Sequence, residues 1–203
     1  MAEQNEILLV EDDLALRTML RGILELNGFK VREAGQRNAA LDQLRAHPMI
    51  DVVILDLGLP PFAHQITEGI QTLKEIQAGI LPVKVIALTG QDQDAAALEA
   101  IREGAFDFLA KPAPAETILS AVRRAQLFQQ KERELNREGI TRIALNAQRS
   151  EGLKGVRSDA EERLVRQVLR ETGFNVYQSA KRLGVKRENI YYFMKKFGIQ
   201  RDD

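Results

Sequence analysis

ILLVEDD (residues 7–13) and VVILDLG (residues 52–58) are the two stretches that decide the fold. Each is an apolar run with the length of one β-strand that ends in acidic residues. Three further apolar runs lie at residues 30–34, 83–88 and 106–109. Helical patterns alternate with them, at about 14–26, 38–46, 68–78, 94–103 and from 114 onward. This alternation predicts an α/β fold, a doubly wound five-stranded parallel sheet with helices on both faces.

The composition is that of a globular protein, because 44% of the 203 residues are hydrophobic and 29% are charged. The absence of cysteine excludes a disulfide framework and a thiolate nucleophile, and fits a reducing compartment. No apolar run is long enough to span a bilayer, and MAEQNE at the start does not resemble a signal peptide. We therefore expect a cytoplasmic protein with no membrane partner.

The net charge of zero conceals an uneven distribution. Residues 1–124 carry 12 basic and 18 acidic side chains, whereas residues 174–201 carry seven basic side chains and one acidic, Glu188. A local basic excess is expected of a module that contacts nucleic-acid phosphates. A solvated helical surface would give the same excess, so charge alone leaves both interpretations open.

We expect three segments, at residues 1–124, 125–155 and 156–203. The helix from about 114 keeps a charged helical pattern to about 138, and the composition from 139 to 155 is typical of a flexible joint. Ala121, Phe128 and Leu135 recur every seven residues, which leaves open a solvated linker helix or a dimerisation helix. Ser158, with Glu161 three residues later, predicts the start of a small all-α domain. Its helices should span about 159–171, 176–183 and 186–197.

Acidic residues follow two of the predicted strands. Ligands bind beyond the carboxyl ends of parallel strands where the strand order reverses, so Glu11, Asp12 and Asp56 converge if the first and third strands are neighbours. Like charges about 4 Å apart repel by roughly 4 kcal/mol at an effective dielectric of 20, so the cluster needs a cation. Carboxylate oxygens without His or Cys nearby suit Mg²⁺. Asp13 has a simpler role, as the cap of the next helix.

Two more groups fall at strand ends on the same rim, Thr89 after the fourth strand and Lys111 after the fifth. A carboxylate nucleophile, a metal, a hydroxyl and an ammonium together make a phosphoryl-accepting site. One acidic pair, or one lysine before a proline, would carry little weight. Matching groups at so many strand ends favour a functional site.

The segments LLVEDD, VVILDLGLP, VIALTG and DFLAKP resemble the receiver domain of response regulators, over about residues 5–125. The resemblance implies a flavodoxin-like fold in which Asp56 accepts a phosphoryl group from a sensor histidine kinase. It also implies a Mg²⁺ ion held by Asp12, Asp56 and the Gly58 carbonyl, with Glu11 acting through water. Thr89 and Lys111 would bind and neutralise the phosphoryl oxygens. Phe108 stands at the aromatic switch position, and Lys111–Pro112 would be a cis peptide bond.

The loop GLPPFAHQITEG (residues 58–69) departs from the receiver pattern, because it reaches Gly69 about five residues later than in typical receivers. We expect this loop to affect partner choice or access to Asp56.

Residues 175–199 have the spacing of a helix-turn-helix. Small Ala180 and turn residue Gly184 allow steep packing, while Ile190 and Met194 face back toward the domain. The exposed side of the second helix would contact double-stranded DNA, and its candidate residues are Lys186, Arg187, Glu188, Asn189, Tyr191, Tyr192 and Lys195. A three-helix packing unit without DNA binding is the alternative.

With VLRETGFN before it, this segment resembles the Fis-type domain that ends NtrC-class activators, over about residues 158–200. The resemblance implies Arg187 and Asn189 as the main base contacts, and Tyr192 and Phe193 stand where the family usually has basic residues. The sequence has no GxxxxGK[ST] motif, and a linker of about 30 residues cannot hold the ATPase of that class. We therefore expect a homodimeric transcription regulator without that ATPase.

Other functions could use parts of the same pattern. A phosphohydrolase with Asp56 as nucleophile needs a second acid two residues later, where this chain has Gly58. A phosphorelay or adaptor protein would use the C-terminal domain only for dimerisation, which Tyr192 and Phe193 would allow. We expect no enzyme. A dinucleotide-binding protein is excluded because the first strand runs into acids rather than GxGxxG.

Overall fold

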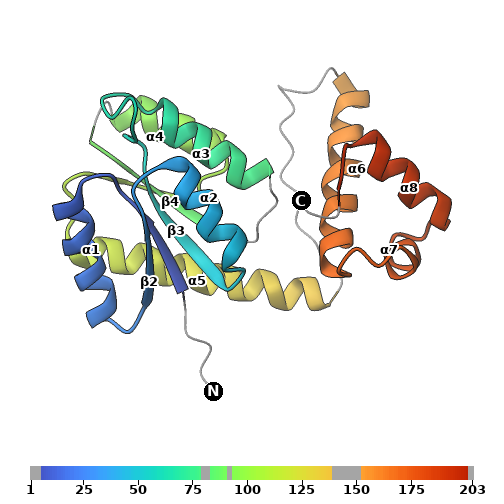
Figure 1. Ribbon diagram of the computed structural model, residues 1–203, viewed down its shortest axis with the longest axis horizontal. Helices are drawn as coiled ribbons and strands as arrows, with labels where there is room; N and C mark the ends of the chain where they lie inside the picture. Colours follow the sequence, from blue (N-terminus) through green and yellow to red (C-terminus); the bar gives the residue numbers. More distant parts are fainter. Residues whose placement is uncertain (1–5, 79–82, 91–92, 139–151, 201–203) are drawn as a thin grey trace. The chain divides into compact units, whose positions relative to one another are not determined.

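The computed structural model describes residues 6–78, 83–90, 93–138 and 152–200 of the chain (Figure 1). The chain divides into two compact units, residues 1–139 and residues 140–203.

The first unit contains a parallel sheet with the strand order β2-β1-β3-β4-β5. Its strands are β1 (Glu6–Val10), β2 (Lys30–Ala34), β3 (Ile50–Asp56), β4 (Lys84–Thr89) and β5 (Asp107–Ala110). β1 pairs with both β2 and β3, so the strand order reverses between β1 and β3. This confirms the predicted doubly wound sheet. It also makes neighbours of β1 and β3, the two strands that end in acidic residues.

Helices cover both faces of this sheet (Figure 1). They are α1 (Leu14–Leu26), α2 (Arg37–Ala46), α3 (Thr67–Ala78), α4 (Gln93–Arg102) and α5 (Ala115–Arg137). Because successive strand residues point to opposite faces, Leu8 and Val10 join a core with α2, α3 and α4, whereas Ile7 and Leu9 join a core with α1 and α5. The central strands are mainly apolar because both of their faces are buried, and their charged residues Glu6, Asp51, Asp56 and Lys84 stand at or next to a strand end.

Short polar signals set the ends of these elements. The Asp13 carboxylate accepts a hydrogen bond of 2.9 Å from the Leu16 amide, which confirms its predicted capping role. Gly28 and Gly104 stand after α1 and α4 with positive φ, as expected of helix ends, while Gly79 lies outside the described residues. The cis bond predicted at Lys111–Pro112 is present, and Pro60–Pro61 is also cis.

α5 continues 13 residues past residue 124 and packs against the first unit. Ala125 is fully buried, the Phe128 ring lies 5.4 Å from the Phe106 ring, and Arg133 pairs with Asp51 at 2.6 Å. Phe128, one of the residues of the heptad pattern, therefore contacts its own unit through Phe106, although 39% of the residue remains exposed. The domain boundary at residue 124 stays a prediction. The irregular part of the predicted linker, residues 139–151, lies outside the described residues.

The second unit contains α6 (Gly152–Glu171), α7 (Val176–Leu183) and α8 (Arg187–Lys196) around a small apolar core. Asn175 caps α7, and Gly184 ends it in the left-handed conformation, as the predicted turn requires. The predicted start of the first helix was wrong. α6 begins at Gly152, so Ser158 lies inside the helix and is no cap. Gly155 weakens the helix before Ser158, but its cost of about 1 kcal/mol is too small to stop a helix.

None of the helices described is both long and apolar enough to cross a membrane.

Candidate functional site

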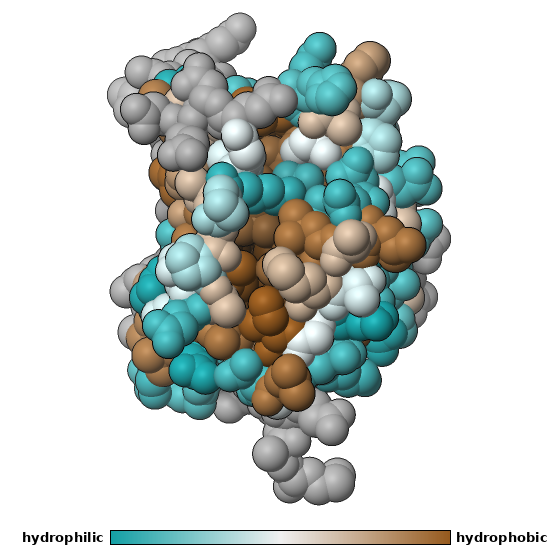
Figure 2. Space-filling model, turned by 90° about the vertical axis from the view of Figure 1, so that its left-hand side faces the viewer, coloured by the Kyte–Doolittle hydropathy of each residue, from teal (hydrophilic) through white to brown (hydrophobic). Residues whose placement is uncertain are grey.

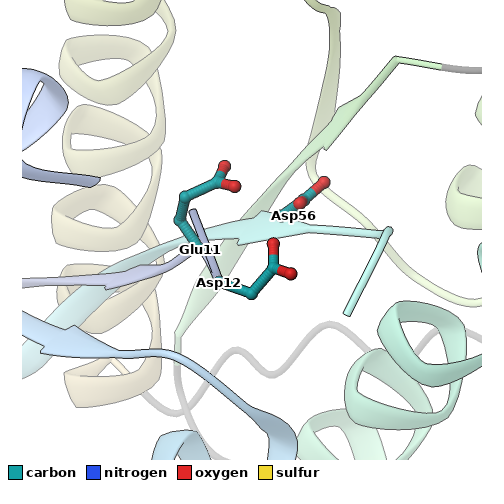
Figure 3. A group of neighbouring side chains, drawn as sticks. All are labelled: Glu11, Asp12 and Asp56. Carbon is teal, nitrogen blue, oxygen red and sulfur yellow. The ribbon is translucent and has the colours of Figure 1, made fainter. Parts of the chain in front are cut away.

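The predicted acidic residues meet at the carboxyl ends of β1 and β3, where the strand order reverses. Carboxylate oxygens of Glu11, Asp12 and Asp56 all lie within 4.8 Å of one another (Figure 3). Glu11 and Asp56 are buried, and Asp12 is more accessible to solvent. Like charges this close repel, so each buried carboxylate needs a cationic partner.

Lys111 supplies that positive charge from the end of β5. Its ammonium Nζ lies 2.6 Å from Glu11 Oε2 and 3.0 Å from Asp56 Oδ2. The backbone amide of Lys111 donates to the Thr89 carbonyl at 2.7 Å, which ties the residue to the end of β4. The long side chain then reaches past β4 to the carboxylates of β3 and β1, so one ammonium bridges both buried acids.

Burial and pairing oppose each other at this ion cluster. Burial, together with the charge of Asp56, raises the pKa of Glu11 to about 7, although the hydrogen bond from Lys111 lowers it. Burial alone would lower the pKa of Lys111, but the hydrogen bond to Glu11 and the charge of Asp56 outweigh it and raise that pKa. The Lys111 ammonium therefore stays charged at neutral pH.

The Asp56 carboxylate is held at both of its oxygens. The Gly58 amide donates to Oδ1 at 3.1 Å, while Lys111 contacts Oδ2. A Cβ atom at position 58 would lie 2.7 Å from the Ala63 carbonyl oxygen, so the long loop folds back and leaves room only for glycine there. The effect of this loop on partner choice stays a prediction.

Thr89 and Phe108 lie where the strand pattern places them. Asp56 pairs with Leu88 in the sheet, so Thr89, which is buried, is one residue nearer the rim on the neighbouring strand. Phe108 is half-buried on β5 and packs against the core of the α2, α3 and α4 face. The roles that the receiver resemblance gives to these two residues stay predictions.

Arg17 is a site residue that the sequence analysis missed. Its guanidinium, on α1, donates to the backbone carbonyl of Glu11 at 2.5 Å and lies 3.4 Å from the Glu33 carboxylate. Arg17 therefore ties the acidic turn to the edge of the sheet. An arginine in the first turns of a helix carries no sequence signal that separates it from a solvated one.

The donor set fits Mg²⁺. Lys111 pairs with Glu11 and Asp56, whereas the Asp12 carboxylate makes no hydrogen bond or ion pair within the part of the chain that the structure describes. Asp12 is therefore open for a metal. The cluster offers carboxylate oxygens alone, which are the ligands that hard cations such as Mg²⁺ prefer.

Apolar surface lies on the side of the first unit viewed in Figure 2, where hydrophobic residues gather between hydrophilic ones. Leu14, the residue that follows the acidic turn, begins α1 and is 67% exposed. Met19 and Leu26 are further exposed apolar residues of the same helix. The rim of the site thus borders the exposed apolar side chain of Leu14.

In the second unit, the predicted DNA-contacting residues are all exposed on α8 and the residue before it: Lys186, Arg187, Glu188, Asn189, Tyr191, Tyr192 and Lys195. Ile190, between them, is buried in the core. Two neighbouring cations are less available, because Arg182 pairs with Glu171 at 2.5 Å and Lys196 pairs with Glu161 at 3.1 Å. Lys186, Arg187 and Lys195, by contrast, form no ion pair with any residue that the structure describes.

Two known families match the two units. Residues 7–123 match the response regulator receiver domain, and residues 156–197 match the bacterial regulatory proteins of the Fis family. The match to the helix-turn-helix segment agrees with the turn at Gly184 and the burial of Ile190 described above.

Individual proteins match the first unit. The C4-dicarboxylate transport transcriptional regulatory protein DctD of Pseudomonas aeruginosa is 35% identical over 122 residues, which are 60% of this chain and 25% of DctD. The chemotaxis protein CheY of Bacillus subtilis is 32% identical over 119 residues, 58% of this chain and 94% of CheY. The chain thus spans only a quarter of DctD.

A solved structure agrees with these matches. A receiver domain protein from Clostridium thermocellum is 29% identical, with a TM-score of 0.58 over 63% of this chain and 98% of its own. The receiver match spans more than half of the sequence and contains the whole carboxylate cluster. The chain therefore belongs to the response regulators, with a receiver domain followed by a Fis-family helix-turn-helix domain.

Proposed function

We propose that this response regulator is a two-component transcription regulator that accepts a phosphoryl group on Asp56 from a sensor histidine kinase and binds double-stranded DNA through α8. One observation carries the proposal, the Lys111 ammonium that bridges Glu11 and Asp56 while Asp12 remains unpaired among the described residues. The role is regulatory rather than enzymatic, because the chain itself carries the group that is transferred.

In the proposed reaction, an oxygen of Asp56 attacks the phosphorus of a phosphohistidine. The new O–P bond forms as the N–P bond breaks, and the imidazole leaves with a proton. Lys111 neutralises charge on the phosphoryl oxygens, and the Thr89 hydroxyl donates to one of them. Asp12, Asp56 and the Gly58 carbonyl would hold Mg²⁺, with Glu11 acting through water. The bound ion would neutralise further charge on the transferring group.

The receiver half of the proposal is tested by phosphorylation with acetyl phosphate and Mg²⁺. The wild-type chain should gain one phosphoryl group that hydroxylamine releases, as expected of an acyl phosphate, and Asp56→Asn should gain none. Asp13→Asn is the matched control, since Asp13 belongs to the same acidic turn but caps α1. Undiminished labelling of Asp56→Asn would remove Asp56 from the reaction, and undiminished labelling in EDTA would remove the metal.

The DNA half is tested by binding of the full chain to duplex DNA at increasing salt, with and without acetyl phosphate. Affinity should fall steeply with salt, because Lys and Arg displace phosphate counterions. Arg187→Ala should weaken binding, whereas Arg182→Ala should change it less, since Arg182 already pairs with Glu171. No affinity for any duplex at low salt would favour the adaptor alternative.

A homodimer completes the proposal, because one small helix-turn-helix makes too few contacts for tight specific binding. Phosphorylation of Asp56 would shift the dimer equilibrium through Thr89 and Phe108, by no more than the free energy with which the phosphoryl group favours one state. Sedimentation with and without beryllofluoride should show a change of mass that Thr89→Ala reduces. One mass distribution in every sample, across the concentrations tested, would contradict this coupling.

A further inference from the structure

The outer face of α8 carries an acid and an aromatic ring at its centre. Glu188, Tyr192 and Lys195 follow one another at helix spacings of four and three residues, so they share one face. This outer strip is exposed, and Ile190, on the opposite side of the helix, is buried. Tyr192 is 60% exposed. Only one of the three residues of the strip is therefore a cation that could contact DNA phosphates.

The Tyr192 ring is supported by the core of the domain. It meets the Phe193 ring edge-on at a centroid distance of 5.5 Å, and Phe193 stacks on Phe197 at 6.0 Å and an interplanar angle of 5°. Both phenylalanines are half-buried and pack against the core of the unit. An exposed ring supported in this way loses little side-chain entropy on binding, which suits it to a specific contact.

Glu188 restricts what the outer strip can bind. Its carboxylate makes no hydrogen bond or ion pair with the residues that the structure describes. An acid in the first turn stabilises a helix through the helix dipole, but on a DNA-binding face it repels phosphate. Its favourable partners in the major groove are exocyclic amines, chiefly N4 of cytosine. If α8 binds DNA, Glu188 must therefore face base edges.

We propose that Glu188 and Tyr192 are specificity-determining residues that read neighbouring bases in the major groove. Glu188 accepts a hydrogen bond from a cytosine N4 amine, and the Tyr192 ring contacts the methyl group of a thymine. Four residues separate the two along the helix by a rise of about 6 Å, which places the two bases one or two steps apart. This inference rests on the proposed DNA binding and adds the class of site that α8 selects.

Tyr191 provides a matched control one residue away. It is exposed to a similar extent, 62%, but lies off the outer strip and lines a hollow beside the start of α7 with Phe174 and Met194. A ring in that position is not aimed along the outer strip. Its replacement should therefore leave the reading of thymine methyl groups unchanged.

The test uses the full chain and a duplex selected from a random pool, in which each thymine is replaced in turn by deoxyuridine. Deoxyuridine lacks only the methyl group. Wild type should bind about fourfold more weakly when one particular thymine is replaced, the factor that corresponds to about 0.8 kcal/mol for one buried methyl group. Tyr192→Ala should lose this difference, whereas Tyr192→Phe should keep it. Tyr191→Ala should also keep the difference between thymine and deoxyuridine, even where it lowers the affinity for both duplexes.

A second measurement addresses Glu188. Sites selected by Glu188→Ala should lose the preference for cytosine at one position next to the methyl-sensitive thymine and keep the others. Thermal unfolding should show that every variant is folded at the temperature of the binding assay, because the replaced side chains are exposed.

Specific DNA binding with no deoxyuridine effect in wild type, or with an effect that survives Tyr192→Ala, would overturn the inference and leave the proposed function intact. So would a cytosine preference that survives Glu188→Ala. A wild-type chain that binds no duplex at low salt, with or without acetyl phosphate, would instead overturn both.

Discussion

Lys111 is the residue on which the charge balance of the receiver site depends. Its side chain is 22% exposed, while those of its partners Glu11 and Asp56 are 1% and 7% exposed. Removing one partner of a buried ion cluster leaves the remaining charges without compensation, which costs far more than the loss of a surface ion pair.

We predict that Lys111→Met lowers the free energy of unfolding by about 3 kcal/mol. Mg²⁺ should restore part of the loss, because a cation bound at Asp12 and Asp56 reduces the same repulsion. Urea unfolding of the full chain with and without Mg²⁺ measures both effects. Lys84→Met is the control, since Lys84 pairs with Glu132 at the start of β4, away from the carboxylate cluster. Equal responses of the two variants to Mg²⁺ would contradict the metal assignment.

Glu6 provides a pH-dependent contribution at the other end of β1. The hydrogen bond from Lys30, with that from Arg32, lowers the pKa of this buried carboxyl below its usual 4.5. A carboxyl whose pKa is lower in the folded state stabilises the fold above its unfolded pKa. That contribution is lost as the pH falls through the folded pKa.

We therefore predict that Glu6→Gln is less stable than wild type at pH 7 and that the difference shrinks below about pH 4.5. Urea unfolding across pH 3 to 7 measures the difference. A gap that stays constant or widens on acidification would show that the ion pairs of Glu6 do not stabilise the fold.

At the scale of elements, α3 is held unusually close to the end of β3. A Cβ atom at Gly69, in the first turn of α3, would lie 2.2 Å from the Leu57 Cα atom. The Gly69 amide also donates to the Leu57 carbonyl at 3.2 Å. Gly69, at the end of the long loop, is therefore required by a backbone contact. The loop must place the start of α3 against Leu57, next to the carboxylate site.

Two glycine-to-alanine substitutions in helices should have opposite effects. Gly69→Ala should destabilise the chain by about 3 kcal/mol or more, because the backbone of α3 or β3 has to move. Gly22→Ala, in α1, should stabilise it by up to about 1 kcal/mol, since no atom lies within 4 Å of the added Cβ and alanine is the better helix former. Chemical denaturation of both variants measures the change in the free energy of unfolding, which should be negative for Gly69→Ala and positive for Gly22→Ala. Similar stability of both variants would contradict the close packing of α3.

At the scale of the whole molecule, the question is where the receiver ends. The family match ends at residue 123, but α5 continues to Arg137, and its later residues contact the first unit. The Phe128 ring contacts the Phe106 ring at a tilt, and Arg133 pairs with Asp51 at the start of β3. We propose that these residues belong energetically to the receiver although they follow the segment that defines its family.

A fragment of residues 1–138 should accordingly be more stable than one of residues 1–124, by about 2 to 4 kcal/mol for the lost aromatic and ionic contacts. Urea unfolding of both fragments measures this difference. In the full chain, Phe128→Ala should reproduce part of it, while Leu127→Ala, at an exposed neighbouring position, should change little. Fragments of equal stability would place the boundary at residue 124.

The sequence by itself determined the order and type of the elements of the receiver, the turn of the second domain, and the residues at the strand ends. These are local properties, because the spacing of apolar residues and the capping residues Asp13 and Gly184 act within one or two turns. Local signals were insufficient at α6, where a capping pattern at Ser158 lay inside a longer helix.

The tertiary structure decided which side chains come into contact. Placing β1 beside β3 brings Glu11 next to Asp56, and the same packing lets Lys111 bridge them and Arg17 hold the acidic turn. The spacing of residues along the chain could not predict these distances, since Lys111 lies 100 residues from Glu11. Packing also places the last turns of α5 against the first unit, and it places Tyr191 and Tyr192 on different sides of α8. In each case a side chain takes the position in which its apolar part is buried and its polar groups are paired.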